Sequence, residues 1–345
     1  MSDELPEPDR AGDLPHPRRV YDLFGHDAAE RAAAEAFSGG RMHHAWMITG
    51  PKGCGKATLA WRLARRVLGA EPAGEGGALA SQRDDPVCQR LEARAHPGLL
   101  LIRRPWNEKT KKLRAEITVE EARRAPDFFS RSAADGGWRV AIVDCADELN
   151  TNAANALLKT LEEPPKRGLL LLIVNAPGRI LPTIRSRCRR LSLRAPDPAA
   201  CAGWLQSRHG VEPGAAEGAA ALAGGAPGRA LALLETGAPA LKTSLDAALN
   251  DLPRLDAGAV MTLADACGRK DGEAMKATVL EFLGDFARGR ARDHALGEAG
   301  PGAARAWVEA ADGLNRLARD SETLYLDPKQ TIHAAFALIR DAASA

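Results

Sequence analysis

Residues 50–58 read GPKGCGKAT and come just after the apolar run AWMI. A buried strand, a glycine-rich loop and then a helix is the order typical of a phosphate-binding P-loop. Gly50, Gly53 and Gly55 allow backbone N–H groups to curl around phosphate oxygens. Lys56 and the N-terminus of the following helix add positive charge at the same place. The stretch therefore predicts an α/β domain with a nucleotide-binding loop.

The position after the lysine departs from the usual P-loop. Ala57 stands where a Ser or Thr hydroxyl normally holds Mg²⁺ between the β- and γ-phosphates. Thr58 follows one residue later, about 100° further around the helix, so its hydroxyl should point elsewhere. We keep Thr58 as a candidate nucleotide contact, together with the glycines and Lys56. The loop is expected to bind ATP or ADP without efficient hydrolysis and to hold no metal.

Composition sets limits on the whole chain. A length of 345 residues allows two or three domains with buried cores. Lys and Arg number 47 against 45 Asp and Glu, which gives a net charge of +2. So balanced a charge creates no global field for nucleic acid or a membrane surface. Any contact with DNA must therefore be local or shared with other chains.

The six cysteines contain no C-x-x-C pair, which argues against a zinc site and a disulfide framework and favours reduced thiols. The N-terminal stretch is acidic and proline-rich and lacks the apolar segment of an export signal. No run of about 18 apolar residues is present that could cross a membrane. We expect a cytoplasmic protein with no membrane partner.

Strand and helix patterns alternate through the first half of the chain. Such alternation predicts a parallel sheet covered on both faces, with ligands at the carboxyl edge of its strands. Residues 1–20 are expected to form a disordered tail, because prolines and charges leave little surface to bury. The predicted strands are residues 45–48, 99–102, 138–144 and 169–174, and the predicted helices are residues 27–37, 56–68, 119–131 and 151–162.

Two arginine-containing segments allow more than one interpretation. Arg62, Arg65 and Arg66 lie off the apolar stripe of helix 56–68, which favours a solvated face. The segment RRPWNEKTKKLRAEI, which starts at Arg103, is strongly basic. It is either a DNA-facing patch or a charged hairpin in water.

A second motif ends the strand at 138–144. The apolar run before Asp144 matches the Walker B pattern, in which the carboxylate supports the Mg²⁺ shell. In AAA+ ATPases a glutamate normally follows and polarises the attacking water, but here the residue is Cys145. A thiol in an apolar setting is a poor base. Asp147 and Glu148 come shortly after, in the loop, and either one is an alternative base.

The runs DELNTNAANALLKTLEEPP (147–165) and LLLLIVNAPGRILPTIRSRC (169–188) strongly resemble bacterial clamp-loader subunits of the AAA+ family. The resemblance spans about residues 21–193 and continues more weakly through the helical remainder. It implies an AAA+ P-loop domain at 21–194, a small helical lid at 195–238, and an all-α collar at 241–345 that joins subunits into a ring. The break at Gly237 agrees with that division.

The same resemblance implies a role in DNA replication. The partners would be the gamma/tau motor subunits and the delta subunit, with the sliding clamp and primer-template DNA bound through the assembled complex. Motor subunits of this family carry a four-cysteine zinc module after the P-loop helix. This chain has only Cys88 in that interval, so no zinc is expected and the fold of residues 69–98 stays open.

Three further residues take roles from the resemblance. Ser186, Arg187 and Cys188 match the family's SRC motif, whose arginine reaches into a neighbouring subunit's ATP site. A guanidinium is a rigid and permanently charged fork that suits a developing γ-phosphate charge. The alternative is that Arg187 is one of five arginines on an exposed strand between residues 185 and 194.

Asn175 matches the sensor 1 position at a strand end, although a polar residue there is also a common turn former. Arg229, in GAPGRAL, matches the sensor 2 arginine. The alternative is that it is an ordinary surface arginine on a helix.

Two functions compete. One is a largely non-hydrolysing loader subunit that acts as a stator and donates Arg187 to a neighbour. The other is an active AAA+ motor. The absence of both the hydroxyl at Ala57 and the base at Cys145 favours the first, because each supports phosphoryl transfer separately. A nucleotide kinase fits poorly, because it has no use for an SRC motif or an all-helical C-terminal third.

Overall fold

A computed structural model of the chain describes residues 7, 10, 14–130, 136–269, 272–297 and 300–345. Its contacts divide the chain into two compact units, Met1–Leu231 and Ala232–Ala345. The division falls within helix α9 (Pro227–Glu235). All the candidate site residues belong to the first unit.

The first unit is built on a five-stranded sheet with the order β2-β5-β6-β1-β7, and every neighbouring pair is parallel. Strands β1 and β6 lie in the middle and are buried along their whole length. Continuous apolar runs suit strands that are covered on both faces. The strands are β1 (Ala45–Thr49), β2 (Leu99–Ile102), β5 (Arg139–Val143), β6 (Gly168–Val174) and β7 (Arg189–Ser192).

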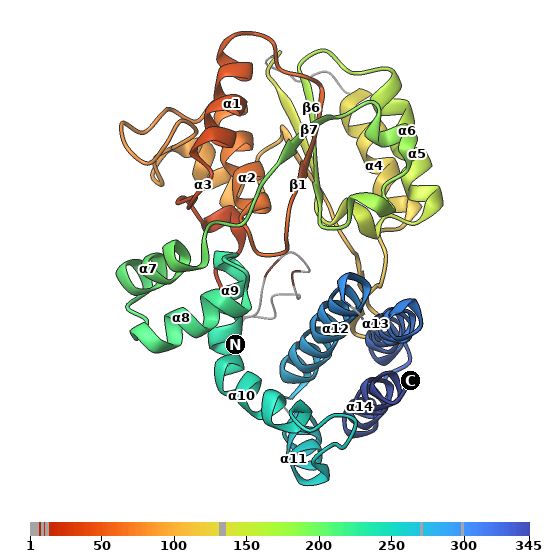
Figure 1. Ribbon diagram of the computed structural model, residues 1–345. Coiled ribbons are helices and arrows are strands. Elements are labelled where there is room, and N and C mark those ends of the chain that lie inside the picture. The colour runs from red at the N-terminus through yellow and green to blue at the C-terminus, as the bar shows by residue number, and fades with distance from the viewer. Residues whose placement is uncertain (1–6, 8–9, 11–13, 131–135, 270–271, 298–299) are drawn as a thin grey trace. The chain divides into compact units, whose positions relative to one another are not determined.

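Successive side chains of each strand enter two separate cores. On β1, Trp46 and Ile48 face one core, while Ala45 and Met47 face the other. Helices α1 (Asp27–Ser38), α2 (Lys56–Val67) and α3 (Pro86–Glu92) cover the first face. Helices α4 (Val119–Ser130), α5 (Thr151–Glu162) and α6 (Pro182–Arg185) cover the second, as Figure 1 shows. The predicted α/β P-loop fold is therefore confirmed.

Helix boundaries in this unit follow local signals. The Asn150 side chain caps α5 by accepting a hydrogen bond from the Ala153 N–H at 2.9 Å, which satisfies a backbone donor of the first turn. Helix α4 ends at Ser130, and Arg131, the last residue of the predicted helix, lies outside the described residues.

The predicted disordered tail is wrong for residues 14–20. They include a short 3-10 helix, η1 (Pro17–Arg19), and both His16 and Arg18 are buried. The His16 ring packs edge-on against Trp61 of α2, with 5.9 Å between the centroids. Tertiary contacts with α2 supply the order that local composition does not. The remainder of the predicted tail, residues 1–6, 8–9 and 11–13, lies outside the described residues.

The predicted solvated face of α2 is wrong for Arg62 and Arg65, because other segments of the chain cover both side chains. Arg62 forms a buried ion pair with Glu30 of α1 at 2.5 Å. Arg65 donates to the carbonyl oxygen of Val20 at 3.0 Å, and its guanidinium lies 3.9 Å from the centre of the Tyr21 ring. Residues that lie off an apolar stripe can thus be buried when polar partners meet them.

The segment between α2 and β2, whose fold the sequence does not predict, contains helix α3 and several polar contacts. Asp85 caps α3 by accepting from the Val87 N–H at 2.7 Å. The Cys88 thiol is buried and donates to the Ser81 hydroxyl at 3.4 Å. The basic segment after β2 forms an antiparallel hairpin of β3 (Trp106–Asn107) and β4 (Lys112–Leu113). The hairpin interpretation is correct, and a contact of this segment with DNA stays a prediction.

Beyond β7, the elements in the described residues are all helices, which confirms the predicted helical C-terminal part. In the second unit, Phe286 of α12 and Trp307 of α13 meet edge-on with ring centroids 5.7 Å apart. The functions of residues 195–238 as a lid and 241–345 as a collar stay predictions. The helices are α7 (Pro198–His209), α8 (Pro213–Leu222), α9, α10 (Ala238–Leu249), α11 (Ala257–Cys267), α12 (Glu273–Leu296), α13 (Gly300–Thr323) and α14 (Pro328–Ala343).

Candidate nucleotide site and surface arginine

The P-loop joins β1 to α2 with a backbone that only glycine adopts easily. Gly53 has φ 77° and Gly55 has φ 105°, and Gly55 is the residue that precedes the first turn of α2. A side chain at either position would be strained. The sequence expectation that these glycines shape the loop is consistent with this geometry.

Lys56 points back into the loop. Its ammonium donates to the carbonyl oxygens of Gly50 at 2.8 Å and Pro51 at 2.6 Å, and the residue is buried. Burial lowers the pKa of Lys56, and the charges of Asp144 and Asp147 act against that shift. The lysine therefore sits between the loop and the acidic residues that follow β5.

The N-terminus of α9 closes over the same loop. The Gly228 N–H donates to the Gly53 carbonyl oxygen at 2.8 Å. A Cβ atom added at Gly53 would lie 2.3 Å from the backbone nitrogen of Arg229. The structure thus places the backbone of Arg229 next to the P-loop, and a nucleotide contact by its side chain stays a prediction. In the sequence, only the glycine at position 53 indicates this close approach of the two backbones.

Asp144 and Cys145 follow β5, beside Lys56. Asp144 is buried, and Cys145 has a left-handed backbone with φ 53°. Burial raises the pKa of the Cys145 thiol well above its usual value, and the neighbouring charges of Asp144, Glu148 and Asp147 raise it further. At neutral pH this group is a protonated thiol and cannot act as a general base.

Asn175, at the end of β6, contacts the loop that follows β5. Its side-chain amide donates to the Cys145 sulfur at 3.4 Å, and its backbone N–H donates to Asp147 Oδ1 at 2.9 Å. The two adjacent strand ends are thereby joined through side chains. The anchoring role of Asp147 was not foreseen, because its position in the sequence shows only that it follows the strand.

Glu148, the other acidic residue of this loop, lies next to Arg104, with 3.0 Å between Arg104 Nε and Glu148 Oε2. Burial raises the pKa of Glu148, and the charge of Arg104 opposes that effect. Glu148 is therefore engaged by a cation from the end of β2. On α2, Ala57 and Thr58 are both half-buried. No hydroxyl stands at the usual metal-holding position.

Arg187 lies away from this cluster, in the turn between α6 and β7. One terminal nitrogen is 3.0 Å from Glu162 Oε1 at the end of α5, and the other donates to the Thr183 carbonyl oxygen at 3.0 Å. Its side chain is 37% exposed. The expectation of an exposed strand from 185 to 194 is wrong for residues 185–188 and 193–194, because β7 spans only Arg189–Ser192.

The flanking residues of the SRC motif have structural contacts. The Ser186 hydroxyl donates to the Thr183 carbonyl oxygen at 3.1 Å. Burial raises the pKa of Cys188 to about 12, and this side chain packs against the core between the sheet and α4, α5. Both neighbours therefore anchor the turn that presents Arg187.

A family model described as DNA polymerase III, delta subunit, matches residues 25–197, half of the chain. The chain belongs to this family. The matched residues include the P-loop, the loop after β5, Asn175 and the turn with Arg187.

Individual relatives agree with this family. The delta′ subunit of DNA polymerase III from Pseudomonas aeruginosa is 38% identical over 192 residues, which are 55% of this chain and 56% of that protein. The delta′ subunit from Escherichia coli is 34% identical over 200 residues, 58% of this chain and 57% of that protein. The tau subunit from Escherichia coli is 32% identical over 181 residues, 52% of this chain and 26% of that protein. The alignments thus cover little more than half of the two delta′ subunits.

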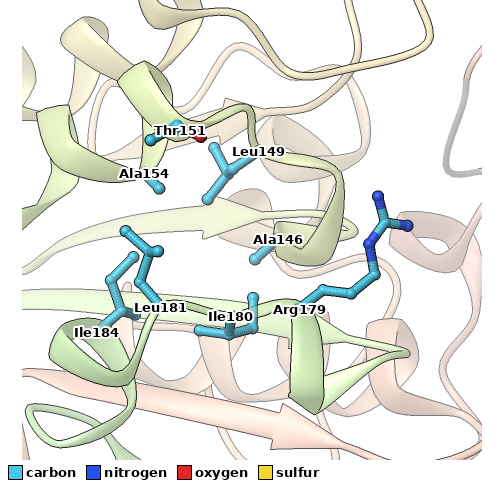
Figure 2. A pocket seen from close by; sticks show the side chains of 8 residues that line it. All are labelled: Ala146, Leu149, Thr151, Ala154, Arg179, Ile180, Leu181 and Ile184. Atoms are coloured by element: carbon cyan, nitrogen blue, oxygen red, sulfur yellow. The ribbon is translucent and has the colours of Figure 1, made fainter.

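This member of the delta-subunit family has a small pocket next to the loop after β5. Its volume is about 60 Å³, which accommodates a small side chain and is too small for a nucleotide. Most of the side chains that Figure 2 draws around the pocket are apolar, and the Arg179 guanidinium is directed away from them. The pocket contains none of the predicted nucleotide contacts. Its lining residues are Ala146, Leu149, Thr151, Ala154, Arg179, Ile180, Leu181 and Ile184.

The described residues lack two kinds of feature. Within them, no helix is long and apolar enough to cross a membrane. The same ranges contain no group of three or more His, Cys, Asp or Glu side chains arranged to hold a metal ion.

Proposed function

We propose that this chain is a clamp-loader subunit of the replicative DNA polymerase that does not hydrolyse ATP effectively itself. It acts as a stator in the assembly that loads the sliding clamp onto primed DNA. It donates Arg187 in trans to the ATP site of a neighbouring gamma/tau motor subunit. The delta subunit completes the set of protein partners, and primer-template DNA is bound through the complex.

The state of Cys145 carries this proposal. A general base must accept a proton near neutral pH, and the raised pKa of this buried thiol leaves it protonated. Ala57 removes a second support, because it offers no oxygen to Mg²⁺. Each defect costs on the order of 10² or more in rate, so the two together leave the pocket nearly inactive.

The surroundings of Arg187 support the donated role. Its guanidinium is partly exposed, and within the described part of the chain it contacts the Glu162 carboxylate and the Thr183 carbonyl oxygen. Glu162 is itself about half exposed, so solvent weakens the ion pair. A γ-phosphate presented by a neighbouring subunit would carry more negative charge than Glu162 and would compete for the same guanidinium.

We also propose that any nucleotide bound by this chain is held weakly and is not turned over. Before it can reach a phosphate, the Lys56 ammonium must give up its bonds to the Gly50 and Pro51 carbonyl oxygens. That exchange reduces the net gain from the lysine. Titration of the isolated chain with a fluorescent ATP analogue measures the affinity.

The second candidate is an active AAA+ motor, which the retention of Lys56 and Asp144 favours. ATP hydrolysis by the isolated chain distinguishes the two. We expect turnover far below about one per second, because both supports of the reaction are missing. Turnover at or above that rate would exclude the stator. DNA-stimulated hydrolysis by the reconstituted loader, measured with and without this chain, then tests its contribution to the complex.

The role of Arg187 is tested by Arg187→Ala in the reconstituted loader. We expect assembly to be intact. ATP hydrolysis at the site that receives the arginine should fall about 10³-fold, which slows ATP turnover by the whole complex. Arg185→Ala is the matched control, because Arg185 is an exposed arginine two residues away on α6. Equal turnover in the two variants would dismiss the donated arginine.

A further inference from the structure

Strand β7 forms one edge of the sheet. Within the described ranges, β1 is the one strand that pairs with it. Three of its four residues, Arg189, Arg190 and Ser192, are exposed. The strand at the opposite edge, β2, is apolar and alternates between half-buried and buried residues. The sheet therefore ends on one side in an exposed and charged strand. We call β7 together with Arg194 the basic edge.

The backbone of β7 directs polar groups away from β1. The Leu193 N–H donates to the Thr49 carbonyl oxygen at 2.7 Å, so the backbone of Leu193 faces β1. Along a strand, successive residues direct their backbone groups to alternate sides. Arg190 and Ser192 therefore direct their N–H and C=O groups to the open side of β7. An edge strand with such a row of polar groups is a template for a further strand.

Arginine side chains flank this edge on both faces of the sheet. The Arg189 guanidinium carbon lies 4.6 Å from the centre of the Trp46 ring, on the face that α1 and α2 cover. Arg190 lies on the other face, where its Nε donates to the Thr49 hydroxyl at 3.4 Å. Arg194 is exposed just beyond the strand. Among the described residues, no carboxylate forms an ion pair with any of these three arginines.

The charge of the basic edge determines which strand it can accept. Pairing with the same edge of a second copy would bring arginines opposite arginines, and like charges across a strand pair are destabilising. Carboxylates at those positions would form charge-assisted hydrogen bonds with the guanidinium groups. Because Arg189 and Arg190 lie on opposite faces, the complementary strand carries acidic side chains at adjacent positions.

A polypeptide suits the edge better than the backbone of a nucleic acid does. Phosphate oxygens accept hydrogen bonds from guanidinium and backbone N–H groups, but ionised phosphates of a nucleic acid have no proton to donate. The carbonyl oxygens of Arg190 and Ser192 need donors, which the N–H groups of an added strand supply. An added strand thus satisfies both kinds of backbone group at once.

We propose that the basic edge binds an extended acidic segment of a protein partner by strand addition to β7. Backbone hydrogen bonds to Arg190 and Ser192 hold the segment, and the arginines select acidic side chains. The strand has only four residues, so the arginine contacts supply much of the affinity, and salt weakens binding. Neither ATP turnover nor the role of Arg187 enters this proposal.

The test uses the full chain and the fluorescein-labelled peptide Val-Glu-Glu-Val-Glu-Glu-Val, with binding followed by fluorescence polarisation at low salt. Arg189→Gln with Arg194→Gln should weaken binding about tenfold or more, because two charge-assisted contacts are lost. A second peptide has proline in place of each valine. It keeps the charge but loses backbone donors and cannot continue a ladder, so it should bind at least about tenfold more weakly.

A substitution in β7 tests the backbone contact from the side of the protein. Ser192→Pro removes an N–H that faces the open side and leaves the ladder with β1 in place, as prolines on edge strands do. It should weaken binding of the valine peptide about fivefold. If a variant of β7 unfolds, as judged by circular dichroism, the two peptides compared on the unaltered chain still decide.

A charge-matched control separates the basic edge from general attraction. Arg305→Gln with Arg340→Gln also removes two positive charges, from exposed positions in the second unit. This variant should weaken binding of the valine peptide less than about twofold, because exposed charges far from a ligand are screened.

Four results would overturn the proposal. Equal binding of the valine and proline peptides would mean charge attraction without strand addition. Equal effects of the β7 pair and the control pair would remove the site itself. Tighter binding of a single-stranded oligonucleotide of equal charge, with the same dependence on Arg189 and Arg194, would make the edge a nucleic-acid surface. No binding at about 1 mM valine peptide would also reject it.

Discussion

The side-chain amide of Asn175 donates a hydrogen bond to the sulfur of Cys145, with 3.4 Å between nitrogen and sulfur. The bond joins the ends of the neighbouring strands β5 and β6 at the edge where the P-loop lies. A thiol can occupy this position as a weak acceptor, but its raised pKa prevents it from taking a proton. The contact is therefore suited to hold the loop rather than to activate water.

The reactivity of the thiols tests this assignment. We expect iodoacetamide at about pH 8 to label Cys145 and Cys188 at least about tenfold more slowly in the native chain than in urea. Their raised pKa values reduce the thiolate fraction, although less acidic thiolates are intrinsically better nucleophiles and recover part of the rate. Peptide mass spectrometry measures labelling at each cysteine. Rapid labelling of native Cys145 would reveal an ionised thiol and would reopen the question of a base there.

Ionisation of a buried thiol should also lower the free energy of unfolding at alkaline pH. The pKa of Cys188 is 9.0 unperturbed and about 12 in the folded chain, so folding favours the protonated thiol. Its contribution is complete below the unfolded pKa and is lost as the pH rises from 9 toward 12. By about pH 10.5 the loss from this one group should be about 2 kcal/mol. Urea unfolding below pH 9 and at about pH 10.5 measures this loss of stability. The Cys188→Ala variant should lose correspondingly less stability between the two pH values.

The close approach between Gly53 and Arg229 leads to a prediction about backbone strain. Gly53→Ala should lower the free energy of unfolding by at least about 2 kcal/mol, from the left-handed backbone and from the clash with a backbone nitrogen. Gly203→Ala is the matched control, because Gly203 lies inside α7 with no atom near its added Cβ. That variant should stabilise the chain by about 1 kcal/mol. Similar urea midpoints for the two variants would mean that α9 does not pack on the P-loop.

Removal of one partner of the buried ion pair between Arg62 and Glu30 should strongly destabilise the folded chain. Arg62→Ala should lower the free energy of unfolding by about 3 to 5 kcal/mol, because it leaves a carboxylate buried without its cation. Arg124→Ala, which removes the exposed pair with Glu121 on α4, should change it by less than about 1 kcal/mol. Urea unfolding of both variants compares them. A small effect at Arg62 would indicate that water reaches the pair in the folded state.

Much of the fold follows from local patterns. The apolar runs of β1, β5 and β6 are buried. A strand that is covered on both faces needs a continuous apolar run, and such a run is easily recognised in a sequence. The glycines of the P-loop and the cap at Asn150 are equally local signals. The segment with Arg187 was harder to predict, because a short helix and a turn precede β7 within a run that contains many arginines.

The burial of Arg65 and the order of residues 14–20 depend on each other, because Arg65 donates to the Val20 carbonyl oxygen. The burial of Arg62 depends on Glu30 of α1. None of these contacts is visible in local sequence. The periodicity of a helix shows on which side of the helix a side chain lies. It does not show which distant segment of the chain packs against that side.

Residue type and short-range order were enough to predict the P-loop, the parallel sheet, the missing hydroxyl at Ala57 and the thiol at Cys145. Packing between distant segments fixes that Arg229 meets Gly53, that Asn175 bonds Cys145, and that Arg62 pairs with Glu30. Those contacts join segments far apart in the chain. Their energies depend on distances and burial that no local pattern encodes.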